Sequence, residues 1–309
     1  MSAGGSHKAI LAALGANLGV AVGKFAAFLV TGAASMLAEA IHSVADSANQ
    51  VLLLFGWRQA GRAPTEEHPF GFGRERYFWS FVVALVLFTL GGVFALAEGV
   101  DKLRHPHDVE DVGVAIAMLG LAIVLEGFSL RTAVRESRPA KGDLSWWRFI
   151  RTSRSPELPV VLLEDSGALA GLTLAILAVS AAAVTGNADF DALGTLGIGA
   201  LLLVIAAILM VEMKGLLIGE SALPGELEAI RAAVETTAAV RSVIHLRTEH
   251  LGPDDVLVGV KIELDPHADM LSVAGTINAA ERAIRQVVPA ARMIYVEPDV
   301  RAMGATDTE

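Results

Sequence analysis

Six long apolar stretches alternate with polar connections over the first 218 residues. They cover residues 9–30, 33–56, 77–100, 112–130, 158–184 and 193–211. Each is long enough to cross the roughly 30 Å hydrocarbon core of a membrane as a helix. The pattern predicts an α-helical polytopic membrane protein with six transmembrane helices. Asn17 and Lys24 are polar exceptions in the first stretch and Glu126 interrupts the fourth. We read the first stretch as a retained span, because no clear cleavage site follows it.

The second stretch carries more polar residues than a lipid-facing helix tolerates. Five of them follow one another at spacings of four, three, four and three, which makes one stripe along a helix. They are Ser35, Glu39, His42, Asp46 and Asn49. A charged side chain inside a membrane costs about 3 kcal/mol on insertion scales, so such residues usually face a cavity or a partner. The stripe therefore predicts an ion or proton path, and the alternative is a polar seam against a neighbouring helix.

Two adjacent carboxylates, Glu164 and Asp165, lie a few residues inside the fifth stretch. Neighbouring positions on a helix are about 100° apart, so both line one cavity only if it is wide or lies at the helix edge. We expect Asp165 to belong to the same site as the stripe. The alternative for one of the two is an ion pair with Arg148 or Arg151 at the membrane surface.

These residues together suit a divalent metal, which binds imidazole nitrogen and carboxylate oxygen at about 2.0–2.2 Å. His42, Asp46 and Asp165 would supply three ligands. Tetrahedral coordination needs a fourth, which Glu164, Asn49 or water could provide. The chain has no Cys, which excludes thiolate ligands, disulfides and thiol catalysis.

The texture of the sequence changes after residue 218. Amphipathic segments predict helices over 226–239 and 272–287, and β-rich runs predict strands over 243–251, 256–264 and 292–296. The order αββαβ predicts a small α+β domain. We divide the chain into a membrane domain over 1–218, a C-terminal domain over 219–302 and a disordered tail over 303–309.

Composition and charge agree with a membrane protein. Hydrophobic residues make up 53% of the 309 residues, and the mean hydropathy is +0.54. A formal net charge of −10 argues against nucleic-acid binding. Lys and Arg gather in the connections after the second and fourth stretches, which predicts that both termini are cytoplasmic.

Several motifs resemble those of one transporter family. These are LAEAIHSVADSANQ in the second stretch, HPFGFGRER in the loop after it, LLEDSGALAG in the fifth stretch, and the αββαβ tail. Together they resemble the zinc-transporter-like branch of the cation diffusion facilitator family of divalent-metal/proton antiporters. The resemblance implies a homodimer, a tetrahedral site between spans two and five, and a ferredoxin-like cytoplasmic domain. His42 and Asp46 match the motif of span two, and Asp165 matches the Asp of span five.

The chain departs from the family pattern in the fifth span. Val161 occupies the place of the usual His, and Glu164 could supply the missing ligand. A site with one His and several carboxylates could admit Mn²⁺ or Fe²⁺ as well as Zn²⁺, and Co²⁺ and Cd²⁺ are further candidates. His68, in the loop after span two, precedes Pro69 and Gly71, and we predict a turn there rather than a metal site.

The C-terminal domain departs from the pattern too. Ile244, Lys261 and Tyr295 stand where many zinc-binding members place ligands, and only Glu297 keeps a ligand type. A fixed lysine cation disfavours a second cation nearby. We therefore expect a dimer whose cytoplasmic contact is indifferent to metal. That contact would rest on apolar strand faces such as Val256, Val258 and Val260.

The sequence thus predicts a metal efflux transporter, a Zn²⁺/H⁺ antiporter first of all, in a bacterial inner membrane. The transported metal would be its substrate, with no cofactor. The rival hypothesis is a membrane-embedded metal sensor or assembly subunit of the same fold, without transport. An enzyme is not expected, because a membrane hydrolase would need a metal-activated water, a general base and a substrate cleft. No motif in the sequence suggests these.

Overall fold

The computed structural model describes residues 3–31, 34–105 and 112–300. For residues 3–5, 30–31, 34–42, 45 and 46 it describes the backbone alone. The chain divides into two compact units. The membrane unit comprises Met1–Arg62 and Glu75–Lys214, and the C-terminal unit comprises Ala63–Arg74 and Gly215–Glu309. The predicted disordered tail lies outside the described residues.

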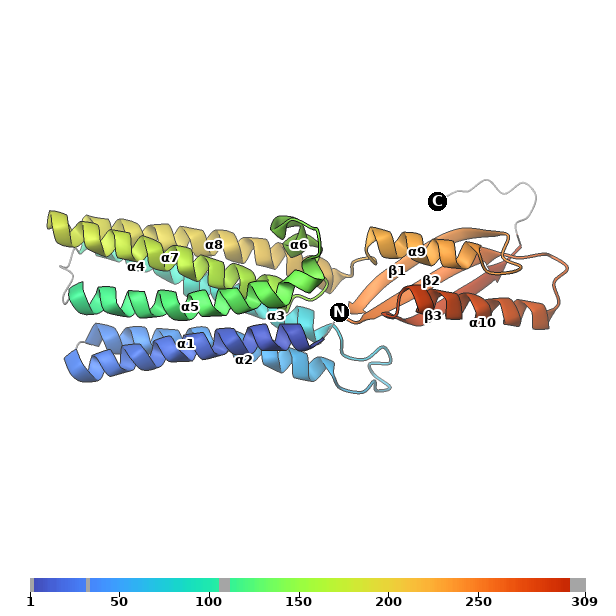
Figure 1. The fold of residues 1–309 in the computed structure, drawn as a ribbon, viewed down its shortest axis with the longest axis horizontal. Helices are drawn as coiled ribbons and strands as arrows, with labels where there is room; N and C mark the ends of the chain where they lie inside the picture. The colour runs from blue at the N-terminus through green and yellow to red at the C-terminus, as the bar shows by residue number, and fades with distance from the viewer. Residues whose placement is uncertain (1–2, 32–33, 106–111, 301–309) are drawn as a thin grey trace. The chain divides into compact units, whose positions relative to one another are not determined.

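Long helices running side by side form the membrane unit (Figure 1). They are α1 (Ala3–Thr31), α2 (Ala34–Ala60), α3 (Glu75–Val86), the π-helical η1 (Leu87–Val93), α4 (Phe94–Arg104), α5 (Val112–Lys141), the short α6 (Trp146–Thr152), α7 (Glu157–Thr185) and α8 (Asp189–Ile218). Among the described residues, five stretches are long and apolar enough to cross a membrane: Ser6–Leu29, Glu75–Arg104, Val112–Lys141, Glu157–Thr185 and Asp189–Ile218. Five of the six predicted spans therefore correspond to such helices. The other, α2, is a helix of 27 residues, and its membrane crossing stays a prediction.

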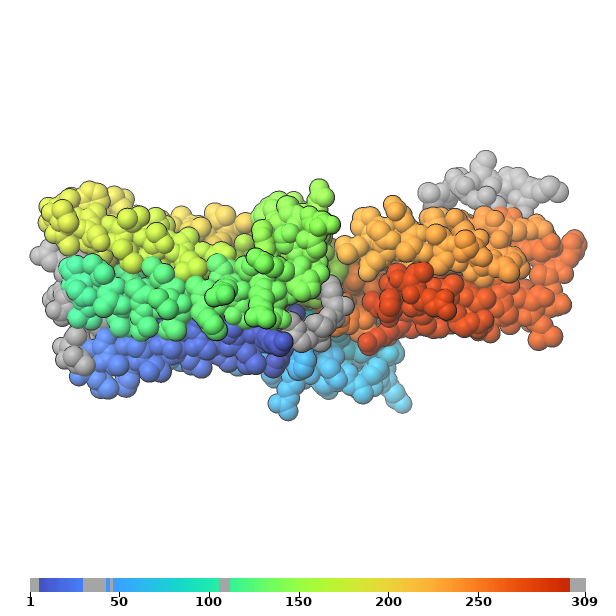
Figure 2. All heavy atoms as spheres, in the orientation of Figure 1, coloured from blue at the N-terminus to red at the C-terminus, as the bar shows by residue number. Residues whose placement is uncertain are grey.

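Small residues bring α1 and α5 close together. A methyl group added at Gly23 would lie 2.9 Å from Leu121 Cδ2, and one at Gly19 would lie 3.0 Å from Leu125 Cδ1. Glycine at these positions therefore leaves room for the two leucine side chains of α5. In Figure 2, α5 (green) lies between α1 (dark blue) and α7 (yellow-green) and packs against both helices.

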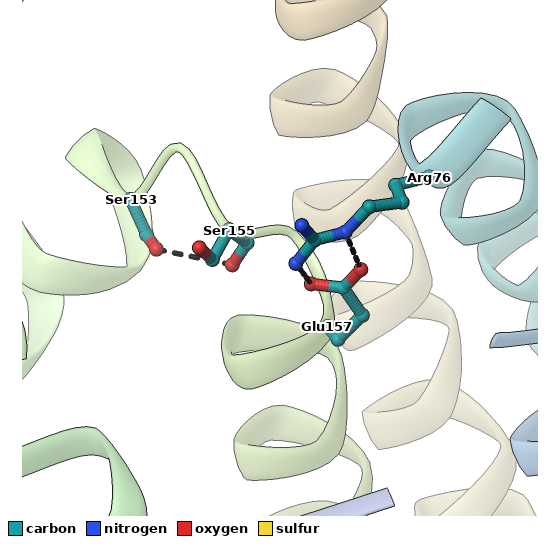
Figure 3. A network of polar contacts seen from close by, with 4 residues as sticks. All are labelled: Arg76, Ser153, Ser155 and Glu157. Carbon is teal, nitrogen blue, oxygen red and sulfur yellow. Dashed lines mark hydrogen bonds and ion pairs between the residues drawn. The ribbon is translucent and has the colours of Figure 1, made fainter. Parts of the chain in front are cut away.

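A buried ion pair fixes the start of α7. Arg76 of α3 and Glu157, the first residue of α7, form a forked contact, with Nη2 donating to Oε2 at 2.8 Å and Nε donating to Oε1 (Figure 3). Beside it, Ser153 Oγ donates to the carbonyl oxygen of Ser155, which orders the link from α6. Both charged side chains are buried, so each depends on the other for compensation. The pair joins α3 to α7 two turns before Glu164.

The C-terminal unit is a three-stranded sheet with two helices on one face (Figures 1 and 2). Its elements are α9 (Pro224–Glu235), β1 (Ser242–Gly252), β2 (Asp255–Glu263), α10 (Met270–Val287) and β3 (Ala291–Asp299). The strand order is β1-β2-β3, with β1 and β2 antiparallel and β2 and β3 parallel. The order of elements is therefore the predicted αββαβ.

The inner face of β2 forms the core of this unit. Val256, Val258 and Val260 are at most 2% exposed and belong to one core cluster with Ile230 of α9 and Ile284 of α10. We expected these valines to form the dimer contact, and that expectation is wrong, because α9 and α10 cover their face. A period of two identifies a face that is buried. It does not say whether the covering element is a helix of the same chain or a second chain.

The loop with the HPFGFGRER motif belongs to the C-terminal unit. The amide of Gly71, whose φ is +83°, donates to the carbonyl of His68 at 2.9 Å, which confirms the predicted turn. A methyl group on Gly73 would lie 2.7 Å from the carbonyl oxygen of Leu251, so the loop can approach β1 this closely only with glycine. Arg74 forms an ion pair with Glu249 of β1.

Candidate metal site

The predicted ligands lie on two helices of the membrane unit. His42, Asp46 and Asn49 are in α2, and Glu164 and Asp165 are in α7. The side chains of His42 and Asp46 lie outside the described residues, so only their backbone is placed. Among the described side chains, no group of three or more His, Asp or Glu is arranged to hold a metal ion. The described part of the predicted site is therefore Asn49, Glu164 and Asp165.

Two amide side chains of α2 hold the carboxylate of Glu164. Asn49 Nδ2 donates to Oε1 and Gln50 Nε2 donates to Oε2, each at 3.0 Å. Hydrogen bonds from neutral amides orient a carboxylate but do not cancel its charge. Glu164 thus joins α7 to α2 three residues beyond Asp46, which is about 4.5 Å along the helix axis.

Asn49 keeps one polar atom unused. Its Oδ1 is buried and has no hydrogen-bond partner among the described residues, and the residue is only 3% exposed. A buried acceptor left unpaired costs about 1–3 kcal/mol, so native proteins rarely keep one without a reason. An amide carbonyl oxygen is also a ligand for divalent cations. Asn49 therefore carries a free ligand atom on the amide group that binds Glu164.

Asp165 lies between α7 and α5. The residue is only 2% exposed. Its carboxylate accepts a hydrogen bond from Ser129 Oγ of α5 at 2.6 Å. Glu126, one turn earlier on α5, is also buried, and its charge interacts with that of Asp165. Neighbouring carboxylates in an apolar setting attract cations, because a cation between them lowers their mutual repulsion.

A cavity of about 320 Å³ adjoins these carboxylates. It has room for a cation and several waters, each of which occupies about 30 Å³. The π-helical segment η1 contributes Leu87 and Gly91 to its wall, and π-helical turns are frequent at functional sites. The polar residues that line it are Asn17, Lys24, Ser43, Glu126, Glu164 and Asp165.

Sequence reasoning missed part of this cluster. It treated Asn17 and Glu126 as isolated polar exceptions and passed over Gln50 and Ser129. The signal was present, because polar residues inside apolar spans are functional by default. These residues are far apart in the sequence, so the sequence does not show that α1, α2, α5 and α7 are neighbours here. Hydrophobic pattern gives the face of each helix but not which helices are neighbours.

The structure also bears on the missing imidazole. Val161, at the position of the family's usual His, is 0% exposed. A larger side chain there would have to displace its neighbours. The same helix places Glu164 three residues later, beside the cavity.

In the C-terminal unit, the residue expected to exclude metal forms two ion pairs. Lys261 Nζ lies 3.0 Å from Glu297 Oε1 and 3.0 Å from Asp299 Oδ2. The β2–β3 register places Lys261 opposite Glu297. Hydrogen bonds to Asp299 and Glu297 raise the pKa of Lys261, and the Lys261 ammonium lowers the pKa of Asp299. The carboxylates that a metal would need are thus already paired with the lysine cation.

The family model of the cation efflux transmembrane domain matches residues 10–218. The mitochondrial proton-coupled zinc antiporter SLC30A9 of Xenopus laevis is 35% identical over 245 residues, which cover 78% of this chain and 44% of that protein. Metal tolerance protein C4 of Arabidopsis thaliana is 30% identical over 268 residues, covering 86% of this chain and 58% of that protein. The magnetosome protein MamM of Magnetospirillum gryphiswaldense is 23% identical over 286 residues, covering 90% and 83%. The chain thus spans less than half the length of the frog relative.

Proposed function

The chain belongs to the zinc-transporter-like branch of the cation diffusion facilitator family, and we propose that it exports a divalent metal cation in exchange for protons. A family member of this kind is a multi-pass membrane transporter of metal cations rather than an enzyme. The buried Asp165 and its half-buried neighbour Glu164, beside a cavity between helices, are the observation that carries the proposal.

Zn²⁺ is the substrate we propose first. The relatives named as zinc antiporters support it, and so does a ligand set of nitrogen and oxygen. Replacement of the second His by valine makes the site richer in carboxylate, which favours Mn²⁺ or Fe²⁺ as the alternatives. Competition among Zn²⁺, Mn²⁺, Fe²⁺, Co²⁺ and Cd²⁺ in the same vesicles would rank them.

The proposed ligands are His42, Asp46, Asp165, Glu164 and Asn49. Helical periodicity of about 100° per residue supports the first two, because it puts Asp46 between Asn49 and Gln50 around the axis of α2. Both of those residues bond Glu164. The unpaired Oδ1 of Asn49 supports its place as the fourth ligand alongside Glu164.

Proton exchange follows from the chemistry of such ligands. A metal binds deprotonated carboxylate and neutral imidazole, so protons and metal compete for one site. Opening of the site to one side of the membrane and then to the other would convert this competition into exchange. We further propose a homodimer in a bacterial inner membrane. Both termini would be cytoplasmic, an orientation that the distribution of Lys and Arg supports.

The test is metal flux into proteoliposomes under an imposed pH gradient. We expect Zn²⁺ uptake driven by the gradient, and its loss in Asp46→Ala protein. Asp143→Ala is the matched control, because Asp143 is an exposed carboxylate outside the site. Uptake by Asp46→Ala at the normal rate would contradict the ligand assignment. Metal binding without flux in the wild type would instead indicate the sensor or assembly subunit.

A further inference from the structure

A chain of hydrogen bonds through side-chain amides leads from α1 to the proposed ligand on α7. Asn17 Nδ2 donates to Gln50 Oε1 at 3.0 Å, and Gln50 Nε2 donates to Glu164 Oε2 at 3.0 Å. Gln50 is 0% exposed, which makes it one of the largest fully buried side chains among the described residues. We call Asn17 and Gln50 the amide relay.

The relay has a direction that the carboxylate sets. An ionised carboxylate can only accept hydrogen bonds, so Gln50 must turn its NH₂ group toward Glu164. Its carbonyl oxygen then faces Asn17, and Asn17 must in turn present its own NH₂ group. One charge on α7 therefore fixes the orientation of two amides on two other helices.

A buried amide is an expensive way to join apolar helices. Its polar ends cost free energy in an apolar setting unless both are bonded, and leucine or methionine would fill the same volume without that cost. Asn17 also lines the cavity that Glu164 and Asp165 line. The relay is thus polar at a place where packing does not require it, and its end point is a proposed metal ligand.

We propose that Asn17 and Gln50 are positioning residues that hold the Glu164 carboxylate in the orientation for cation binding. This inference rests on the proposed function of Glu164 as a metal ligand, and it extends the site to α1. The relay acts through Glu164 and does not touch the cation. Groups that orient metal ligands typically change metal affinity by about 10–100-fold when they are removed.

The experiment is calorimetric titration of the full-length protein in detergent with Zn²⁺. Gln50→Met and Asn17→Leu replace each amide with an apolar side chain of similar length, and we expect each to weaken Zn²⁺ binding by about 10-fold. In a Glu164→Gln background the same two changes should weaken it no further, because the relay then has no carboxylate to position. Ser47→Ala is the matched control, since Ser47 is buried on the same helix and its hydroxyl donates to the carbonyl of Ser43 in that helix, outside the amide relay. We expect it to bind as the wild type does.

Asn17→Asp gives a test of sign. An aspartate at this position accepts hydrogen bonds only, so it draws the NH₂ group of Gln50 away from Glu164. The relay therefore predicts weaker Zn²⁺ binding, although a negative charge has been added at the wall of a cation cavity. Stronger binding by Asn17→Asp, or additive losses in the Glu164→Gln background, would overturn the relay. Asp165→Ala separates the two hypotheses: if it binds Zn²⁺ normally the proposed function fails, and if it loses Zn²⁺ while the relay variants bind normally only the relay fails.

Discussion

Carboxylates are compensated in two different ways in the two units of this protein. In the membrane unit, Glu164 accepts hydrogen bonds from two amides, and Asp165 accepts one from a hydroxyl. In the C-terminal unit, Glu297 and Asp299 share the ammonium group of Lys261, at 3.0 Å from each. Neutral donors orient a carboxylate and leave its charge, whereas a lysine supplies the cation itself.

The same contrast occurs within one helix. Glu157, at the start of α7, is neutralised by Arg76, while Asp165, two turns later, accepts a hydrogen bond from the neutral hydroxyl of Ser129 beside a cavity. The burial of a carboxylate is therefore a poor predictor of a metal site by itself. The type of donor that holds each carboxylate separates a site that can accept a cation from an anchor that already contains one.

The largest expected effect tests the carboxylate with a neutral partner. Asp165→Asn keeps the shape of the side chain but removes its charge. We expect metal transport in proteoliposomes to fall by more than about 100-fold, because even groups outside the ligand shell change affinity 10–100-fold. Asp189→Asn, which changes an exposed carboxylate at the start of α8, is the control and should transport normally. Comparable transport by both variants would break the distinction drawn between the carboxylates of this unit.

The next prediction concerns the neutralised carboxylate on the same helix. Arg76→Met removes one partner of a buried pair and leaves the charge of Glu157 uncompensated. We expect a loss of about 3 kcal/mol in the free energy of unfolding, measured by denaturant titration in detergent. Arg76→Met combined with Glu157→Leu should recover most of it, since apolar residues can replace a buried ion pair at little cost. If the double variant is as unstable as the single one, the pair has a role beyond mutual compensation.

Much of this arrangement could be predicted from the sequence. Hydrophobic stretches gave the long helices, and alternation in β2 gave a buried strand face, because both patterns reflect burial along one element. Because charge inside an apolar span is costly, the sequence also predicts that the stripe on α2 and the carboxylates of α7 form one site, and that stays a prediction. The loop turn at His68 was predictable from Pro69 and Gly71, since their backbone preferences are local.

What failed or was missed depended on neighbours that are distant in sequence. The valines of β2 were assigned to a dimer contact, but α9 and α10 cover them. Gln50, which the sequence did not single out, bonds Asn17 of α1 and Glu164 of α7. A polar residue's partner is set by tertiary packing, and periodicity alone contains no information about it.

A smaller effect is expected when the carboxylate cluster of the C-terminal unit loses its cation and so becomes more like the cluster of the membrane unit. Lys261→Ala removes the built-in cation and leaves Glu297 and Asp299 without it. We expect weak Zn²⁺ binding to appear in the C-terminal unit of full-length protein that also carries Asp165→Ala, which silences the membrane site. Lys261→Arg is the matched control and should bind no additional metal, because the cation is retained. Tight Zn²⁺ binding by the C-terminal unit with Lys261 intact would contradict the view that the lysine replaces a metal.

The smallest expected effect concerns stability, which the Lys261 ion pairs should not make dependent on pH near neutrality. The hydrogen bond from Lys261 lowers the pKa of Asp299, so this contribution to stability is present above the ordinary Asp pKa of about 3.9 and is lost as the pH falls through the lowered value. The hydrogen bonds to Asp299 and Glu297 raise the pKa of Lys261, so its contribution is present below about pH 10.4 and is lost only as the pH rises through the raised value. Between about pH 5 and 9 both groups stay charged. The contribution of this cluster to stability is the difference in urea unfolding between the wild type and Lys261→Met, followed by hydrogen exchange of the C-terminal unit in the full chain, which cancels the histidines common to both. We expect that difference to be flat across the range, whereas metal transport should change because protons compete with the metal. A difference that shrinks between pH 7 and 5 would show that this cluster also titrates like a metal site.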